Sequence, residues 1–545
     1  MYAARVAARP KLGLNISAAQ TAPRPTLSLK SPGPMPRTPI SPVPTASLTA
    51  QRFSTLQVPT YGYTNSCSSK SILKKQQSSH SGAAGKRIQF KGTPTVYCVT
   101  PIENPDEYYG THTKISREER RWAVRDDDTS VAIVEKMNEI SGANNARVHF
   151  LENITCDSRA HRGIHPILAL ESHQKNLASL VHKALGFLPA SNDGDKSIIL
   201  TDGSSRQRPD FISATRGPGM RSNLSVGLDT GKALSVAWQI PMVGVHHMQA
   251  HLLTPRLVSC LNKDNDTETP GAVNPQFPFL SILVSGGHSI LVHSKSLTDH
   301  TIMASSDDIA MGETLDKAAR EILPPDLLKE AKNTMYGKTL EQFVFPNGPA
   351  DFANYRPPMN RGEEVIKRKS SWGWSVTTPF ANTRALQLSF SSVASMVNKI
   401  VKDREGQLSH DERLDLGREA MRVCFEHLAS RTIIALDALR LTHRDEDEIK
   451  TLVVSGGVAA NKFLMAVLRS FLDVRGFEHM KIVAPPPYLC TDNAAMIGWA
   501  GIEMFEAGWR SDLSCRALRK WTLDRQADDG GVLGPGGWIM DGTAL

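Results

Sequence analysis

Two stretches decide the fold: residues 279–289 read FLSILVSGGHS, and residues 451–461 read TLVVSGGVAAN. Each is a run of β-branched and aliphatic residues followed by Ser-Gly-Gly, a pattern that favours a buried strand ending in a tight turn. Glycine has no Cβ, so such a turn exposes backbone N–H groups that can hold phosphate oxygens. The second Ser-Gly-Gly follows the first by 170 positions. Two such elements in one chain indicate a nucleotide cleft built from two related halves.

A third stretch, PMVGVHHMQAHLL over residues 241–253, joins a predicted strand to two histidines. If the segment from His247 onward is helical, His247 and His251 lie at i and i+4 on one face and can share a metal ion. The alternative, two ordinary helix or core histidines, stays open on this motif alone. A zincin peptidase needs a glutamate directly after the first histidine as general base, and Met248 occupies that place. The peptidase interpretation therefore lacks its catalytic group.

The missing third ligand is predicted in residues 482–496, IVAPPPYLCTDNAAM, which read as a strand, a proline turn and the start of a helix. Asp492 stands at that helix start and would complete a set of two histidines and one carboxylate. Another polar segment, residues 307–317, places Gly312 and Glu313 ahead of a helix that carries Asp316. A solvated, charged helix start is the alternative interpretation of that segment.

The basic charge of the chain is concentrated at its N-terminus. The formal net charge is +8, yet residues 1–102 hold 13 Lys and Arg and no acid, which leaves 50 basic and 55 acidic residues in the remainder. Net charge alone therefore gives no reason to regard the body of the chain as a nucleic-acid binder.

The leader itself is rich in Ser, Pro, Thr and Ala, and we expect it to be disordered because it cannot bury enough apolar surface. Its start, MYAARVAARPKLGL, bears Arg and no acid, like a mitochondrial transit peptide; a generic basic tail is the alternative. Seven scattered cysteines without a CxxC pair favour a reducing compartment over a disulfide scaffold. No run approaches the ~18 apolar residues of a membrane-spanning helix, so we expect a soluble protein.

Periodicity predicts the remaining elements. The expected helices cover residues 164–185, 223–238, 385–400, 418–441 and 462–472, and the expected strands cover residues 129–134, 242–245, 279–284, 290–292 and 451–454. Residues 262–277 read as a polar loop, and residues 346–375 and 402–415 read as polar insertions.

Five motifs follow one another between residues 246 and 501: HHMQAH, VSGGHS, GETLDKAAR, SGGVAANKFL and CTDNAAMIGWAG. In this order and at these intervals they resemble the tRNA threonylcarbamoyl-adenosine transferase family, formerly labelled glycoproteases. The resemblance covers residues 129–507, and the family's mitochondrial branch fits the leader. It implies an α/β, two-lobed actin/hexokinase-like ATPase fold made of duplicated ribonuclease H-like domains. We therefore expect a leader over residues 1–115, lobe I over 116–278, lobe II over 279–491, and a return to lobe I with a C-terminal tail over 492–545.

The resemblance also implies a function: transfer of threonylcarbamoyl from threonylcarbamoyl-AMP to N6 of adenosine 37 in mitochondrial tRNAs that read codons beginning with A. Carried over position by position, one divalent metal ion per subunit (iron, zinc or magnesium) would lie on His247, His251 and Asp492. The adenylate would lie against nine residues: Val284, Ser285, Gly286, Gly287, His288, Asp316, Gly337, Glu341 and Asn461. The implied partners are tRNA, a separate synthase that supplies threonylcarbamoyl-AMP, and a second copy in a homodimer, with no membrane. The implied location is the mitochondrial matrix, and the tRNA footprint would be a local patch on an otherwise acidic body, in the insertions.

The sequence departs from the family at one point. The family opens with an apolar strand that runs into Glu-Ser-Ser-Cys-Asp-Asp-Thr, whereas residues 114–128 here read KISREERRWAVRDDD, and only Asp127, Asp128 and Thr129 match. Such a charged segment is incompatible with a buried strand, so lobe I would lack its first strand. We hypothesise a splicing error in the gene model, which a transcript that encodes this segment in frame would contradict.

Two alternatives remain open at this stage. One is a catalytically impaired scaffold of a tRNA-modification complex, suggested by the departure in the first motif. The other is a small-molecule carbamoyltransferase or kinase of the same fold, which shares the Gly-rich turns but does not account for the pairing of HHMQAH with CTDNAAM.

Overall fold

The computed structural model describes residues 128–138, 144–157, 165–191, 193–194, 196–261, 272–306, 308–330, 336–442 and 448–541. All of them belong to one compact unit, Thr100–Leu545. The predicted leader, most of the departing segment 114–128, residues 262–271 of the polar loop, and Asp307 lie outside the described residues.

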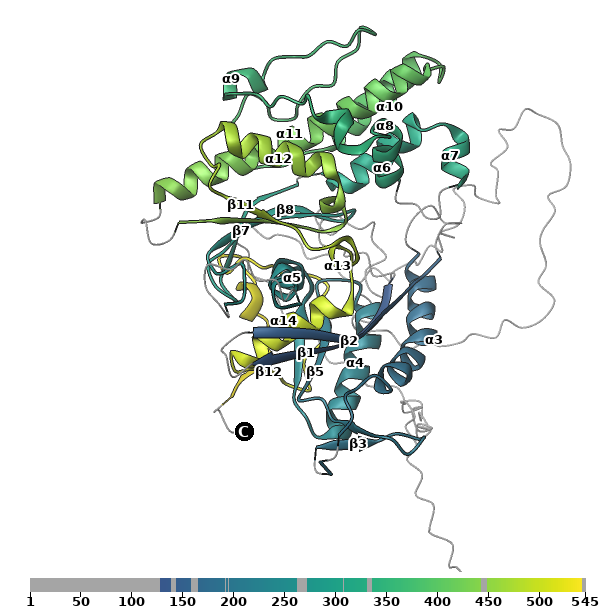
Figure 1. The fold of residues 1–545 in the computed structure, drawn as a ribbon, viewed down its shortest axis with the longest axis vertical. Helices are drawn as coiled ribbons and strands as arrows, with labels where there is room; N and C mark the ends of the chain where they lie inside the picture. The colour runs from purple at the N-terminus through teal and green to yellow at the C-terminus, as the bar shows by residue number, and fades with distance from the viewer. Residues whose placement is uncertain are drawn as a thin grey trace, which may run out of the picture. The chain divides into compact units, whose positions relative to one another are not determined.

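A five-stranded sheet carries both Ser-Gly-Gly motifs (Figure 1). Its strand order is β11-β10-β7-β8-β9, and the bounds are β7 (Phe279–Val284), β8 (Ser289–Ser294), β9 (His300–Ser305), β10 (Thr451–Ser455) and β11 (Lys481–Val483). β7, β8 and β9 form antiparallel hairpins, whereas β10 runs parallel to both β7 and β11. Because Ser455 is level with Leu283 in adjacent parallel strands, the two Ser-Gly-Gly turns leave the sheet at the same edge.

The sheet is buried on both faces, as expected for a sheet covered by helices on each side. Leu280, Ile282 and Val284 of β7 join one apolar core, and Phe279 and Leu283 of the same strand join the other. The first core is shared with α6, α8, α10, α11 and α12, and the second with α5 (Figure 1). The period-two alternation of β7 thus places its turn between two helical layers.

The helices beside the first core have the following bounds: α6 (Met311–Ile322), α7 (Pro325–Glu330), α8 (Gly337–Val344), η2 (Gly348–Phe352), α9 (Arg361–Glu364), α10 (Ser391–Asp403), α11 (His410–Thr442), η4 (Gly457–Ala460), α12 (Lys462–Val474) and α13 (Pro487–Cys490). α6 already includes Gly312 and Glu313, which the sequence placed ahead of it.

Two boundaries were predicted wrongly. The helix expected over residues 385–400 begins only at Ser391, because the guanidinium groups of Arg361 and Arg431 bind main-chain carbonyls at 380–385 and hold that segment out of a helix. The polar insertion expected over residues 402–415 is mostly helix, since α10 ends at Asp403 and α11 begins at His410. Acidic residues in the first turn of α11 interact favourably with its dipole, so polarity was a poor guide there.

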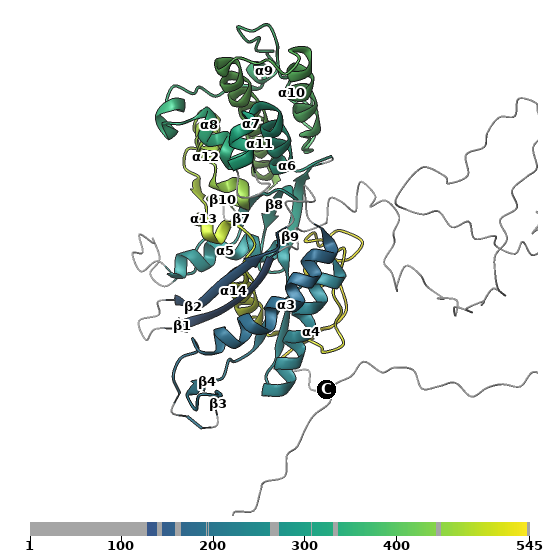
Figure 2. The ribbon, with the colours of Figure 1, turned by 90° about the vertical axis from the view of Figure 1, so that its right-hand side faces the viewer.

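The other half of the unit is built around a second set of elements (Figure 2). These are β1 (Asp128–Asn138), β2 (Asn144–Thr155), α3 (Pro166–Leu185), β3 (Ser197–Ile199), β4 (Ser205–Gln207), β5 (Ile212–Gly217), α4 (Arg221–Trp238), β6 (Met242–His246), α5 (His247–Leu261), α14 (Ala494–Glu506), β12 (Trp509–Ser511), η5 (Gly531–Leu533) and β13 (Trp538–Met540). α3 and α4 pack together and against β1 and β5, while α14 packs against β1, β5, β6 and α5. Residues after Asp492 therefore return to the half that contains β1.

In the described residues, this second half has a gap between the strands β1 and β5. Among the described strands, β1 pairs with β2 alone and β5 pairs with β6 alone. A cavity of about 700 Å³ lies between β1 and β5, with α3, α4 and α14 as further walls. The strand expected at residues 129–134 is confirmed as β1. Residues 114–127, on which the expectation of a missing first strand depends, lie outside the described residues.

Four buried cysteines, Cys260, Cys424, Cys490 and Cys515, are free thiols. No helix in the described part of the chain has the length and apolarity needed to cross a membrane.

Candidate metal and adenylate site

The first two site histidines are placed by a strand that passes directly into a helix. All five residues of β6 are buried, and α5 begins at the next position, His247. His246 caps this junction, since its Nδ1 accepts hydrogen bonds from the backbone N–H of Met248 at 3.1 Å and of Gln249 at 3.4 Å. Burial lowers the pKa of His246 to about 3, so its ring is neutral and can accept. The sequence analysis gave no role to His246.

The third residue arrives from the start of α14. Asn493 is the N-cap of this helix and its side chain accepts from the N–H of Met496, while Asn153 of β2 donates to the carbonyl of Asp492 at 3.2 Å. Both contacts fix Asp492 at the end of α5 that carries the histidines.

His247, His251 and Asp492 come together as one cluster in which the possible ligand atoms lie within 4.8 Å of one another. Oδ1 of Asp492 is 2.9 Å from Nε2 of His251 and 3.4 Å from Nε2 of His247. The two rings are 4.8 Å apart and nearly perpendicular. This is the one-face arrangement expected from i and i+4 helix positions.

The electrostatics of the cluster match the donor set of a divalent metal site. Burial lowers the pKa of His251, which favours the neutral imidazole that binds metals. Burial alone would raise the pKa of Asp492, but the two histidines outweigh it and hold that pKa below its usual value. Two neutral imidazoles and one ionised carboxylate fit zinc or iron well, and the residues present therefore fit the implied ion.

Residues on β1 and α3 adjoin the cluster, although the sequence did not assign them to the site. Oγ1 of Thr129 lies 2.8 Å from Nδ1 of His173, and both side chains are buried. They line the same cavity as His247 and Asp492. Burial and the nearby Asp492 carboxylate raise the pKa of Asp128. The Asp-Asp-Thr match was a visible signal for this position, whereas no motif marked His173.

The predicted adenylate residues lie at the edge where the two Ser-Gly-Gly turns meet. The hydroxyl of Ser285 accepts hydrogen bonds from the N–H groups of Gly287 and His288 and closes the first turn. Gly456, at φ +90°, lies so close to this turn that a Cβ would be 2.3 Å from the carbonyl oxygen of Val284. A Cβ on Gly312 would likewise be 2.6 Å from the carbonyl oxygen of Ser285. Glycine is therefore required where the turns and α6 meet.

The remaining adenylate positions connect to the same edge. The N–H of Gly337 donates to Asp316 at 2.9 Å, and Glu341 accepts from the N–H of Lys462 at 2.8 Å. Asn461, the neighbour of Lys462, is the N-cap of α12. Burial raises the pKa of Glu341, and the hydrogen bond from Lys462 opposes this rise. Gly337 thus contacts another predicted adenylate residue, Asp316, and Glu341 contacts Lys462, the direct neighbour of a third, Asn461.

The metal cluster and the adenylate turns are linked by α13. This short helix precedes Asp492 and packs against both η4, which contains the second Ser-Gly-Gly turn, and α5, which carries the histidines. All three segments can therefore face one ligand.

A family model described as tRNA N6-adenosine threonylcarbamoyltransferase matches residues 149–499. The mitochondrial tRNA N6-adenosine threonylcarbamoyltransferase of Schizosaccharomyces pombe is 35% identical over 76% of this chain and 87% of its own length. The Rhizobium leguminosarum enzyme of the same name is 30% identical over 74% of this chain and 93% of its own. The chain belongs to the tRNA N6-adenosine threonylcarbamoyltransferase family.

Membership in the tRNA N6-adenosine threonylcarbamoyltransferase family makes the chain a transferase and confirms the resemblance, including its mitochondrial branch. It also supports an α/β fold of the actin/hexokinase-like kind. All twelve predicted site residues lie within the matched range. Component A of the Acidaminococcus fermentans (R)-2-hydroxyglutaryl-CoA dehydratase overlaps 71% of this chain and 96% of its own, at 12% identity and a TM-score of 0.32.

Proposed function

We propose that this protein transfers the threonylcarbamoyl group of threonylcarbamoyl-AMP to N6 of adenosine 37 in mitochondrial tRNAs that read codons beginning with A. One observation carries the proposal. In a member of this family, the His247–His251–Asp492 cluster and the paired Ser-Gly-Gly turns are joined through α13.

The transfer is a direct displacement in this proposal. N6 of the adenosine attacks the carbamoyl carbon, the bond from that carbon to the AMP phosphate oxygen breaks, AMP leaves with the electron pair, and the N6 proton passes to solvent. None of the predicted site residues forms a Ser–His or Cys–His nucleophile pair, which agrees with transfer without a covalent enzyme intermediate.

The protein's contribution is positioning and charge stabilisation. The Ser285–His288 turn and the start of η4 hold the AMP portion through backbone groups, and Asp316, Glu341 and Asn461 fix the elements around it. When bound by His247, His251 and Asp492, a divalent metal would orient and polarise the threonylcarbamoyl-phosphate end. We propose one such ion per subunit, with iron, zinc and magnesium as the candidates.

Four further features belong to the proposal. The N-terminal 115 residues would act as a disordered leader with a transit peptide for the mitochondrial matrix, which the mitochondrial relative supports. Two duplicated ribonuclease H-like lobes would meet near residue 278, and residues 492–545 would return to the first, as the packing of α14 on β1 and β6 supports. A separate synthase would supply threonylcarbamoyl-AMP, and two copies would form a homodimer.

The sequence left a second candidate open, a catalytically impaired scaffold, and the relatives do not favour it. The cavity between β1 and β5 reaches His247 and Asp492, so the wall of the site beside Asp128 is incomplete in the described residues. Purified protein, assayed with threonylcarbamoyl-AMP and unmodified tRNA, separates the two candidates, because a scaffold produces no modified base.

The test in cells is nucleoside analysis of mitochondrial tRNA from a strain that lacks the protein, complemented with wild type or with His247→Ala/His251→Ala. We expect threonylcarbamoyladenosine to disappear and to return with the wild type alone. Persistence of the modified base without the protein would overturn the transferase proposal. Restoration by the double variant would overturn the role given to the histidines.

A further inference from the structure

Residues 356–384, between η2 and α10, differ in charge from the rest of the body. They hold six Lys and Arg and two Glu, a net charge of +4, whereas residues 103–545 together hold 50 basic and 55 acidic residues, a net charge of −5. This segment, called the basic loop below, is therefore a positive region on a negative body.

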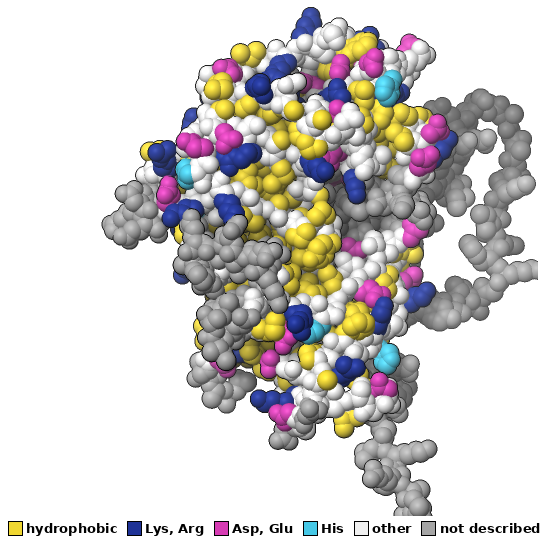
Figure 3. Space-filling model, in the orientation of Figure 1, with side chains coloured by type: hydrophobic (Ala, Val, Ile, Leu, Met, Phe, Trp, Pro, Cys, Tyr) yellow, Lys and Arg dark blue, Asp and Glu magenta, His cyan; other side chains and the backbone are white. Residues whose placement is uncertain are grey.

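The positive charges of the basic loop are presented outward. Arg356, Lys367, Arg368 and Lys369 are exposed, and none of them forms an ion pair with another described residue within 4 Å. Figure 3 shows Lys and Arg side chains, interspersed with acidic and apolar side chains, on the upper part of the face where α9, α11 and α12 lie. Both acids of the loop are engaged: Glu364 is paired with Arg361 and Arg475, and Glu363 accepts from the N–H of Met359.

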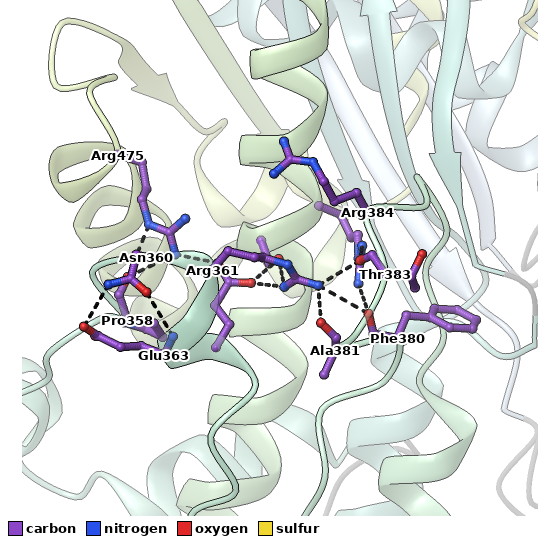
Figure 4. Close-up of polar contacts among 12 residues, drawn as sticks. Pro358, Asn360, Arg361, Glu363, Phe380, Ala381, Thr383, Arg384 and Arg475 are labelled. Carbon is purple, nitrogen blue, oxygen red and sulfur yellow. Dashed lines mark hydrogen bonds and ion pairs between the residues drawn. The ribbon is translucent and has the colours of Figure 1, made fainter.

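The backbone that presents these cations is held in place by other arginines (Figure 4). Arg361 donates to the carbonyls of Ala381 and Thr383, the latter at 2.8 Å, and so ties the start of the loop to its end. Arg475 of α12 donates to the carbonyl of Pro358 at 3.2 Å and to Glu364 at 2.5 Å. Guanidinium groups can satisfy several carbonyls at once, which suits them to fixing an irregular loop. The exposed cations are thus displayed on a fixed segment.

Two tryptophans hold the distal part of the loop. The indole N–H of Trp372 donates to Asp415 at 3.0 Å, and that of Trp374 donates to Glu412 at 3.1 Å. Both acceptors lie near the start of α11. The Lys367–Lys369 run therefore lies between two anchored positions.

The segment that leads into the basic loop packs beside one of the predicted adenylate residues. The rings of Phe352 and Tyr355, just before the loop, pack on Phe463 at centroid distances of 5.2 and 5.4 Å. Phe463 follows Asn461 by two residues at the start of α12. The first residues of the loop are therefore tied to the helix whose N-cap is Asn461.

We propose that Arg356, Lys367, Arg368 and Lys369 bind the phosphate backbone of the tRNA whose adenosine enters the site, an inference that rests on the proposed function. A net-negative body repels tRNA unless it carries a local positive patch, and Lys and Arg contacts to phosphate supply the sequence-independent part of such binding. A fixed patch would orient the polyanion, because phosphate contacts set register rather than specificity.

The test compares two triple variants with the same change in charge. One is Lys367→Ala/Arg368→Ala/Lys369→Ala. The matched control is Lys329→Ala/Lys450→Ala/Lys481→Ala, three exposed lysines of which Lys450 and Lys481 lie at the opposite end of β10 and β11 from the Ser-Gly-Gly turn. The readouts are the Kd for unmodified mitochondrial tRNA over a salt series, the Kd for AMP by calorimetry, and the rate of tRNA modification.

We expect the loop variant to bind tRNA about tenfold more weakly at low salt and to reduce the slope of log Kd against log salt by about 2 to 3, close to one per lost cation. The Kd for AMP should be unchanged, and the control should bind tRNA like the wild type.

Unchanged tRNA affinity in the loop variant, or an equal loss in the control, would overturn the inference. The inference would also be overturned if the loop variant kept its affinity for tRNA but lost its affinity for an acidic protein partner. A wild type that neither binds nor modifies tRNA would overturn the proposed function as well, whereas normal modification by both variants overturns the inference alone.

Discussion

Nε2 of His251 lies 2.9 Å from Oδ1 of Asp492, although 241 positions separate the two residues in the chain. The helices that carry or follow them, α5 and α14, pack directly against each other. The histidine face of α5 is set by β6, and Asp492 is set by the N-cap of α14. The cluster is therefore held by packed helices, which is the rigid support that a metal site requires.

Asp492→Asn tests the carboxylate. The substitution keeps the shape of the side chain but removes its negative charge, so we expect bound metal to fall to a small fraction of one equivalent and transfer to slow by about 100-fold or more. Elemental analysis and single-turnover transfer assays measure these changes. Asp473→Asn, on the exposed face of α12, is the matched control and should leave both values unchanged. Full metal content and rate in Asp492→Asn would contradict the assignment.

Gly456→Ala tests the contact between the two turns. A Cβ at φ +90° would meet the carbonyl oxygen of Val284 at 2.3 Å, so we expect a loss of about 1–3 kcal/mol in the free energy of unfolding and weaker AMP binding. Gly457→Ala is the control for the free energy of unfolding alone, because a Cβ at Gly457 has no protein neighbour within 4 Å. Denaturant unfolding and calorimetry with AMP make the comparison. Equal behaviour of the two variants would show that the contact is unimportant.

Much of the site was predictable because its signals are local. The strand, Ser-Gly-Gly and strand order around Ser285, and the strand, Ser-Gly-Gly and helix order around Ser455, depend on residue types within a few positions, and the structure has these elements where the pattern placed them. The same holds for His247 and His251, whose i and i+4 spacing needs only the start of α5. Asp492 was predicted from its residue type, because a metal ion with two imidazole ligands favours a carboxylate as the third ligand.

Most of the failures were tertiary in origin. Nothing local pairs His173 with Thr129, because that contact depends on segments brought together by packing. The cap that His246 forms on Met248 and Gln249 is local, and the sequence reading missed it. The helix predicted from residue 385 begins at Ser391 because Arg431, in a distant helix, binds the carbonyls of Thr383 and Ala385. The periodicity of apolar residues indicates helix propensity, and hydrogen bonds from side chains to the main chain can override that propensity.

Buried histidines away from the site predict acid sensitivity. Burial lowers the pKa of His427 to about 3 and that of His300 to about 4, in both cases from the usual 6.5. Below pH 6.5 the unfolded chain takes up protons that these folded-state rings refuse, so the free energy of unfolding should fall as the pH falls from 6.5 to 5. Each histidine contributes a slope of at most about 1.4 kcal/mol per pH unit.

The substitution His427→Gln removes one of these buried histidines and so tests its contribution to the pH dependence. Its amide oxygen can still accept from the N–H of Ser389, so the fold should persist while the pH slope between 6.5 and 5 decreases by one proton. Denaturant melts at several pH values measure the slope. His479→Gln, a substitution of an exposed histidine, is measured in parallel as the comparison. A slope that His427→Gln leaves unaltered would contradict the neutral, buried ring.

The gap between β1 and β5 predicts a local difference in stability. β10 has strand neighbours on both sides, whereas β1 and β5 each have one among the described strands. In an antiparallel pair about half of the amides of β1 point away from β2, here toward the cavity, where a backbone group lacks a strand partner. We therefore expect these amides, and those of β5 that face β1, to exchange hydrogen at least about 100-fold faster than the amides of Leu452–Val454 in β10. Hydrogen–deuterium exchange of the full chain measures this directly. Protection of β1 equal to that of β10 would show that another strand occupies the gap.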